Sequence, residues 1–269
     1  VYNLIRTHGA SVTRAVGFAI LAPVLLLLVS NLEGILEFMR LRELGTASFW
    51  GWLGIKDLGT VDTSSWRPND YLWWWRSTRV IDSLGPQGNS LDYTITEFPF
   101  FSFLLGDLHP HLMSIPFVLL FLTFSLDFFL SPVLIGARWV REHLCTVIVA
   151  ALILGSLAFI NIWDIVPFGV LWAAMMIFKA SRQETHQKES GWAQIFPRVW
   201  LPIAVTLGLA ILMYLPYYFS VDSQANGILP VGEVATRPIH FLIIWGLFLA
   251  ILLPFLLRQF PMVLSMPSG

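Results

Sequence analysis

Charged residues are scarce in this sequence. They make up 12% of the 269 residues, whereas a soluble globular domain carries about 25%. This scarcity excludes an ordinary water-soluble domain, and the hydrophobic content of 56% excludes a disordered chain. Lys and Arg number 16 against 17 Asp and Glu. The chain therefore lacks the basic surface that nucleic-acid binding requires, and we expect no nucleic-acid partner.

Cysteine is nearly absent as well. The single cysteine, Cys145, excludes an internal disulfide framework and a metal site built from several thiolates. The chain begins at Val1 rather than Met and ends in a short polar tail after an apolar run. We therefore interpret the sequence as a fragment of a larger protein.

Long apolar runs, in contrast, are abundant. A helix that crosses a bilayer needs about 20 mostly apolar residues. The run over 144–180 is too long for one helix and fits two helices joined by a tight turn. The pattern predicts an all-α fold, a polytopic transmembrane helical bundle that forms one domain over 1–269. Its six expected spans are 15–31, 112–130, 144–161, 164–180, 200–219 and 240–257.

Lys and Arg in the short connections predict the orientation of these spans. The connection after the second span carries Arg138 and Arg141, and the connection after the fourth carries Arg182, Lys188 and Arg198. The turn between the third and fourth spans has neither residue type. The basic connections are therefore expected to be cytosolic, and residues 32–111 form an extracytoplasmic or interfacial loop. We expect a multi-pass protein of the cell membrane.

The first part of the loop has the pattern of a helix that lies in the membrane interface. Its apolar residues share one helical face, with Glu33 and Glu37 largely elsewhere; they are Leu32, Ile35, Leu36 and Met39. Three aromatic residues follow that we interpret as interfacial anchors: Phe49, Trp50 and Trp52.

Three consecutive tryptophans, Trp73 to Trp75, mark the next part of the loop. Taken alone they favour an aromatic belt, because tryptophan is common at membrane interfaces. The alternative is a surface for a sugar ring or a lipid headgroup, on which nearby arginines face a phosphate. The candidate substrate-binding residues of this segment are Arg67, Asp70, Trp74, Arg76 and Arg79.

Asp107, His109 and His111 directly precede the second span. In an extended segment all three side chains point the same way, and on a helix Asp107 and His111 share a face. Three interpretations remain open: a divalent-metal site, an acid–base pair, or polar residues that cap the span. Ionisable groups at the edge of a bilayer favour a functional role. We therefore take all three as candidate catalytic and metal-binding residues.

Four further polar residues lie near the predicted outer ends of the helices. Glu97 precedes the Asp107 segment, Asn161 and Asp164 interrupt the apolar hairpin, and Asn226 follows the fifth span. Asn and Asp also stop helices by bonding their own backbone, so the hairpin pair fits a turn equally well. All four are candidate substrate-binding residues of an outward-facing cavity.

Four blocks of the sequence resemble one family of proteins. RPNDYLWWWRSTRVI, ITEFPFFSFLLGDLHPHLMSIPF, INIWD and LPYYFSVDSQANGI occur in this order. They are similar to the Chlor_Arch_YYY family of uncharacterised, very hydrophobic multi-pass membrane proteins. At the level of the fold, the chain more weakly resembles C-type glycosyltransferases. That resemblance implies transfer of a sugar from a polyprenyl-phosphate donor at the extracytoplasmic face, often with a divalent metal.

The expected function is therefore glycosyl transfer from a lipid-linked sugar. Asp107 is the expected base, and His109 and His111 are expected to hold a metal such as Mg²⁺ or Mn²⁺. That metal or the arginines would balance the charge of the departing phosphate. Two alternatives stay open: a transporter or channel subunit, and a structural subunit without catalysis.

Overall fold

The computed structural model describes residues 1–28, 31–70, 72–83, 85, 87, 89–136, 138–184, 192–221 and 234–264, and the secondary-structure elements in these residues are helices joined by irregular connections. Four helices are long and apolar enough to cross a membrane: Pro110–Leu130, Ile162–Gln183, Ile195–Leu212 and Pro238–Arg258. A pair bent by 72°, Val12–Leu28 and Glu33–Leu41, adds a fifth candidate, and Leu144–Ile160 is a shorter apolar helix. The helical membrane class is confirmed, and the six expected spans agree approximately with these helices.

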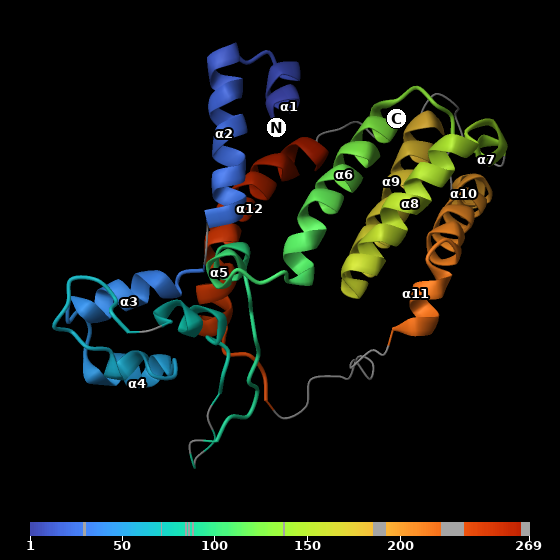
Figure 1. Ribbon diagram of the computed structural model, residues 1–269. Helices are drawn as coiled ribbons and strands as arrows, with labels where there is room; N and C mark the ends of the chain where they lie inside the picture. The colour runs from blue at the N-terminus through green and yellow to red at the C-terminus, as the bar shows by residue number, and fades with distance from the viewer. Residues whose placement is uncertain are drawn as a thin grey trace. The chain divides into compact units, whose positions relative to one another are not determined.

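The described chain divides into two compact units, and each is described here by itself. The first unit comprises Val1–Asp107 and Ile228–Ser268, and the second comprises Leu108–Gly227 (Figure 1). The helices of the first unit are α1 (Tyr2–Thr7), α2 (Val12–Leu28), α3 (Glu33–Leu41), α4 (Ala47–Leu53), η1 (Leu58–Thr60), η2 (Trp73–Thr78), α5 (Pro99–Leu105) and α12 (Pro238–Leu264). Those of the second are α6 (Pro110–Leu130), α7 (Trp139–Glu142), α8 (Leu144–Ile160), η3 (Ile162–Asp164), α9 (Ile165–Glu184), α10 (Trp192–Leu212) and α11 (Leu215–Ser220).

The loop between α2 and α5 forms a small module of its own, built from α3, α4, η1, η2 and the chain up to Tyr93. We call it the loop module. Its apolar core includes Trp50, Leu53 and Val80, which pack with Ile243 and Ile244 of α12. The module is therefore a folded structure supported by a membrane-spanning helix.

The beginning of α12 also caps the end of α4. Arg237 donates from one guanidinium nitrogen to the Leu53 carbonyl at 3.0 Å and from another to the Trp52 carbonyl. The His240 ring nitrogen Nε2 lies 2.8 Å from the same Leu53 oxygen. These bonds satisfy carbonyls that have no partner within α4, so they fix the position of α4 on α12.

The prediction for α3 was partly wrong. Leu32, Leu36 and Met39 lie on one side of α3, as predicted, but they pack against the core of the loop module. Ile35, however, is 58% exposed, whereas Glu33 and Glu37 are fully buried. Hydropathy alone places carboxylates in water, but a carboxylate can be buried when hydrogen bonds and an opposite charge compensate for its lost hydration. Residues of η2 supply both: Arg76 supplies the opposite charge, and Ser77 donates a hydrogen bond.

The second unit is a bundle in which α6, α8, α9 and α10 lie side by side (Figure 1). Its core combines aromatic residues of α6 and α9, such as Phe121 and Trp172, with Leu154 and Leu157 of α8. α8 is apolar on all sides and carries more buried residues than any other described helix of this unit, as expected for a helix packed among others. The predicted hairpin is confirmed, because η3 joins α8 directly to α9.

A glycine allows the close approach of α8 to α10. A Cβ atom added at Gly155 would lie 2.6 Å from the Ala210 carbonyl oxygen and would overlap the Tyr214 ring. Tyr214 in turn donates to the Leu152 carbonyl at 3.1 Å. The substitution Gly155→Ala should therefore force the helices apart and cost about 1–3 kcal/mol. Thermal unfolding in detergent measures this cost.

The matched control is Gly208→Ala in α10. A Cβ atom at Gly208 would meet nothing within 4 Å, and alanine favours a helix over glycine. The control should leave the melting temperature unchanged or raise it slightly. An equal loss in both variants would contradict the close approach at Gly155.

Candidate functional site

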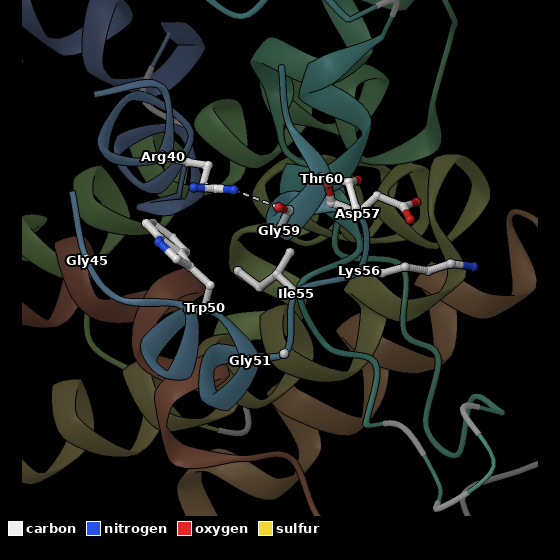
Figure 2. A pocket seen from close by; sticks show the side chains of 11 residues that line it. Arg40, Gly45, Trp50, Gly51, Ile55, Lys56, Asp57, Gly59 and Thr60 are labelled. Atoms are coloured by element: carbon white, nitrogen blue, oxygen red, sulfur yellow. Dashed lines mark hydrogen bonds between the residues drawn. The ribbon is translucent and has the colours of Figure 1, made fainter. Parts of the chain in front are cut away.

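Two neighbouring hollows in the loop module form the candidate site. The larger has a volume of about 470 Å³ (Figure 2), which lies within the 300–1,000 Å³ typical of small-molecule pockets. Its lining residues come from α3, α4, η1 and their connections: Arg40, Gly45, Ala47, Trp50, Gly51, Gly54, Ile55, Lys56, Asp57, Gly59 and Thr60.

Buried donors without acceptors line the larger hollow. Arg40 donates from one terminal nitrogen to the Gly59 carbonyl at 2.9 Å, and its guanidinium carbon lies 6.0 Å from the centre of the Trp50 ring (Figure 2). Arg40 Nε and Trp50 Nε1 are both buried, and neither has a hydrogen-bond partner in the described part of the chain. A buried donor left unpaired costs about 1–3 kcal/mol. The hollow therefore favours a ligand that brings acceptor oxygens.

The backbone around this hollow is shaped by positive φ angles. Gly54 ends α4 with a φ of 69°, and Asp57 has a φ of 63°. A non-glycine residue in this region is uncommon, and such strain is concentrated at functional sites. Figure 2 shows the Lys56 and Asp57 side chains extending together, away from Arg40 and Trp50. The backbone turn at these residues thus presents the Lys56 ammonium group and the Asp57 carboxylate side by side.

Lys56 and Asp57 also line the smaller hollow, which has a volume of about 140 Å³. The other lining residues come from η2 and the chain after it: Trp75, Arg76, Arg79, Asp82 and Tyr93. The guanidinium carbon of Arg79 lies 3.8 Å from the centre of the Trp75 ring, and Arg79 Nε donates to the Tyr93 hydroxyl at 3.0 Å. Stacking of this kind holds the arginine in place while its remaining donors stay available.

Arg76 has a different role from the one expected. Its Nε lies 2.5 Å from Glu37 Oε1, and one terminal nitrogen lies 3.1 Å from Glu37 Oε2 and 3.1 Å from Asp70 Oδ2. The Glu37 side chain is 0% exposed and that of Arg76 is 14% exposed. Arg76 and Asp70, both predicted to bind substrate, are therefore largely occupied by an internal ion-pair network.

Glu33, the first residue of α3 in the loop module, is a second buried carboxyl beside this network. Ser77 Oγ donates to Glu33 Oε2, and the Glu33 backbone N–H donates to Asn31 Oδ1 at 3.1 Å. Burial, together with the negative charge of Glu37, raises the pKa of Glu33 to about 8. Glu33 is therefore protonated at neutral pH, and the pair Glu33 and Glu37 carries a single negative charge that Arg76 balances.

The other predicted residues of the first unit lie outside both hollows. Arg67 is exposed, and its guanidinium carbon lies 5.9 Å from the centre of the Trp66 ring. Trp74 is half-buried and contacts Trp73 edge to face, with ring centres 6.2 Å apart. Glu97 is half-buried. Of the expected phosphate-binding arginines, Arg79 is thus the one whose charge remains available in a hollow.

Asp107 belongs to the first unit, and His109 and His111 belong to the second. Asp107 is exposed, and its backbone N–H donates to the Ser102 carbonyl at 3.3 Å. His109 precedes α6 with an extended backbone, as predicted from Pro110, and its ring centre lies 5.6 Å from that of His111. Among the residues that the structure describes, no group of three His, Cys, Asp or Glu side chains is placed to hold a metal ion.

The structure brings Asn161 and Asp164 together at the turn between α8 and α9. Asn161 Nδ2 donates to Asp164 Oδ1 at 3.0 Å, and the Asp164 backbone N–H donates to the Asn161 carbonyl at 2.9 Å. Both bonds are those of a turn that stabilises itself. The Tyr217 ring of α11 lies near the same end of α8, 5.0 Å from the centre of the Phe159 ring. Asn226 lies outside the described residues.

Sequence analysis missed most residues of the larger hollow. Trp50, expected to be an interfacial anchor, is instead 8% exposed and belongs to the core. Arg40, Lys56 and Asp57 were not singled out at all. The available signal was the series of glycines at 45, 51, 54 and 59 around an arginine and a tryptophan, because glycines mark chain reversals and exposed backbone.

A comparison with protein families covers both units. The model of a family described as uncharacterised membrane protein (DUF2298) matches residues 1–264. The chain belongs to this family. The match includes the loop module and the helical bundle, so both are parts of a DUF2298 protein. No curated protein and no solved structure matches the chain.

Membership of DUF2298 confirms the expected likeness to an uncharacterised family of membrane proteins. With its several apolar helices, the chain is a multi-pass membrane protein. The finer resemblances, to the Chlor_Arch_YYY family and to C-type glycosyltransferases, stay predictions.

Proposed function

We propose that this DUF2298 chain takes part in glycosyl transfer from a polyprenyl-phosphate sugar at the extracytoplasmic side of the membrane. The observation that carries the proposal is the pair of hollows in the loop module that share Lys56 and Asp57. The smaller hollow offers Lys56 and Arg79 beside the Trp75 ring, together with the carboxylates of Asp57 and Asp82. The larger hollow is lined by Arg40 and Trp50, each of which has a donor without a partner among the described residues. This combination suits a phosphate that is joined to a sugar.

In the proposal the smaller hollow takes the phosphate. Lys56 and Arg79 supply its positive charge, and the stacking of Arg79 on Trp75 fixes that charge before the ligand arrives. A hollow of about 140 Å³ has room for a phosphate group but not for a sugar as well.

The sugar then occupies the larger hollow. Sugar hydroxyls accept hydrogen bonds from Arg40 Nε and Trp50 Nε1, two donors of the lining for which the described residues supply no partner. A monosaccharide fits within about 470 Å³, and the four glycines of the lining allow it to approach the backbone closely.

Transfer breaks the bond between the anomeric carbon and the phosphate oxygen, and the bonding electrons leave with the phosphate. The oxygen of an acceptor hydroxyl forms the new bond to that carbon, and its proton passes to a carboxylate. Asp57 is the carboxylate that the geometry favours as this base, and Lys56 and Arg79 balance the charge on the departing phosphate. Asp107 is the base that the sequence predicts. His109 and His111 stay the residues that the sequence predicts to hold a divalent metal.

The test is a transfer assay with full-length protein in liposomes and a panel of radiolabelled polyprenyl-phosphate sugars. We expect Asp57→Asn to lower the transfer rate at least about 100-fold, as is usual for the loss of a general base. Arg79→Gln should chiefly raise the KM for the donor. Arg67→Gln is the matched control, because Arg67 is exposed and outside both hollows.

Two results would count against parts of this proposal. Loss of transfer in Asp107→Asn with full activity in Asp57→Asn would leave glycosyl transfer standing and assign the base to Asp107. Absence of donor binding by the unmodified protein for every sugar in the panel would overturn the proposed function.

A further inference from the structure

A third hollow lies in the second unit, at the end of the bundle where α6 ends. Its volume is about 370 Å³. It is lined by the last residues of α6, the chain after them and the last turns of α9: Phe129, Ser131, Pro132, Leu134, Lys179, Arg182 and Gln183. Two of these residues are cations, and the described lining contains no Asp or Glu.

Lys179 is a fixed cation in this hollow. The residue is only 4% exposed. Its ammonium group donates to the Phe128 carbonyl at 2.9 Å, to the Phe129 carbonyl at 3.1 Å and to the Ser131 carbonyl. These bonds cap the end of α6, and the helix dipole there supplies only about half a negative charge. The charge of Lys179 is thus held in place and only partly compensated.

Arg182 adds a second positive charge one helical turn away. Its guanidinium carbon lies 5.6 Å from the centre of the Phe129 ring, the side chain is exposed, and no carboxylate pairs with it among the described residues. Like charges three positions apart on a helix repel each other. An anion bound between them would remove this repulsion.

The remaining lining explains which kind of anion fits. Phe129, Pro132 and Leu134 are apolar, and Leu134 is 72% exposed. α6 and α9 are both candidate membrane spans, so the hollow lies where two spans end. The basic connections predict that this end is cytosolic. A phosphate with an attached glycerol and acyl chain matches a hollow with cations inside and apolar residues at its edge, and basic pockets between spans bind such headgroups.

We propose that the hollow formed by Lys179, Arg182 and Phe129 binds the phosphate headgroup of an anionic phospholipid from the cytosolic leaflet. The lipid phosphate lies between the two cations, and its glycerol and acyl chains lie along Pro132 and Leu134. This site is independent of the proposed sugar transfer, because all its residues belong to the second unit.

The experiment compares full-length protein in nanodiscs of phosphatidylcholine alone with protein in nanodiscs that also contain phosphatidylglycerol. Native mass spectrometry counts the retained lipids, and thermal unfolding measures stabilisation. We expect phosphatidylglycerol to be retained in preference to phosphatidylcholine and to raise the melting temperature. Arg182→Gln should lower that preference about fivefold, the effect expected for one cation near an anionic surface.

Arg141→Gln is the matched control. Arg141 is exposed in α7, on the side of the membrane predicted for Arg182, and the change removes the same charge. Arg182→Gln leaves the Lys179 bonds to α6 intact, so circular dichroism should show an unchanged helix content. A selective loss in Arg182→Gln supports the site.

Three results would overturn the proposal. One is equal retention of both lipids by the unmodified protein. Another is an equal loss of preference in Arg182→Gln and Arg141→Gln, which indicates a general attraction to negative surfaces. The third is full stabilisation by millimolar inorganic phosphate in phosphatidylcholine nanodiscs, which indicates a soluble anion instead of a lipid.

Discussion

Replacing Arg76 with Ala is expected to destabilise the loop module by about 3–5 kcal/mol. The guanidinium of Arg76 holds Glu37 through two hydrogen bonds and Asp70 through a third. The Glu37 side chain is 0% exposed, so removal of the cation leaves a buried carboxylate without compensation. Chemical unfolding of the detergent-solubilised protein, followed by tryptophan fluorescence, measures the change in the free energy of unfolding.

Two further variants separate the buried ion pair from a general effect of lost charge. Arg67→Ala removes an exposed arginine from the same segment and should change the stability by less than about 1 kcal/mol. The double variant Arg76→Met with Glu37→Leu removes both charges. It should recover most of the lost stability, because two apolar side chains leave no buried charge without compensation. A double variant as unstable as Arg76→Ala would contradict this explanation.

The helices of this protein could be predicted well because hydropathy reports directly on contact with lipid. Each of the six apolar runs contains a helix, and the interruption at Asn161 and Asp164 is the turn between α8 and α9. Inside a membrane the backbone of such a segment must form its hydrogen bonds within the segment. The length and composition of an apolar run are therefore enough to predict a helix there.

The loop module could not be predicted in the same way, because its structure depends on pairs far apart in the sequence. Arg76 reaches Glu37 across 39 positions, and Ser77 reaches Glu33 across 44. A pattern of polar and apolar residues does not contain such pairings. It therefore placed Glu33 and Glu37 in water and assigned Arg76 to a ligand. The hollows depend on the same pairings, and for that reason the pattern of the sequence did not reveal them.

Glu33 makes the stability of the loop module depend on pH in a definite direction. Its pKa rises from 4.5 to about 8 on folding, because burial and the charge of Glu37 disfavour the carboxylate. Between these two values the folded state keeps a proton that the unfolded state has lost, so stability falls as the pH rises. Through this group the module should be most stable at and below about pH 4.5, lose stability up to about pH 8, and change little above that.

The substitution Glu33→Gln should abolish most of this dependence, because an amide has nearly the shape of the protonated acid and does not titrate. At pH 5 the variant and the unmodified protein should be similar in stability. At pH 9 the variant should be the more stable of the two by several kcal/mol, because each pH unit between the two pKa values contributes about 1.4 kcal/mol. Unfolding curves at both pH values measure the difference.

Glu43→Gln is the control, since Glu43 is an exposed carboxylate of the same module that accepts a hydrogen bond from Thr63 at 3.2 Å. Glu43→Gln also removes one carboxylate, but an exposed one. The free energy of unfolding should therefore keep the pH dependence of the unmodified protein. If Glu33→Gln kept that dependence as well, the proton would belong to another group of the network. Glu33 and Arg76 both interact with Glu37. Combining Glu33→Gln with Arg76→Ala therefore also tests whether Glu33 and Glu37 together carry a single negative charge. In that case Arg76→Ala should cost less in the Glu33→Gln background at pH 9, where Glu33 no longer adds a second negative charge.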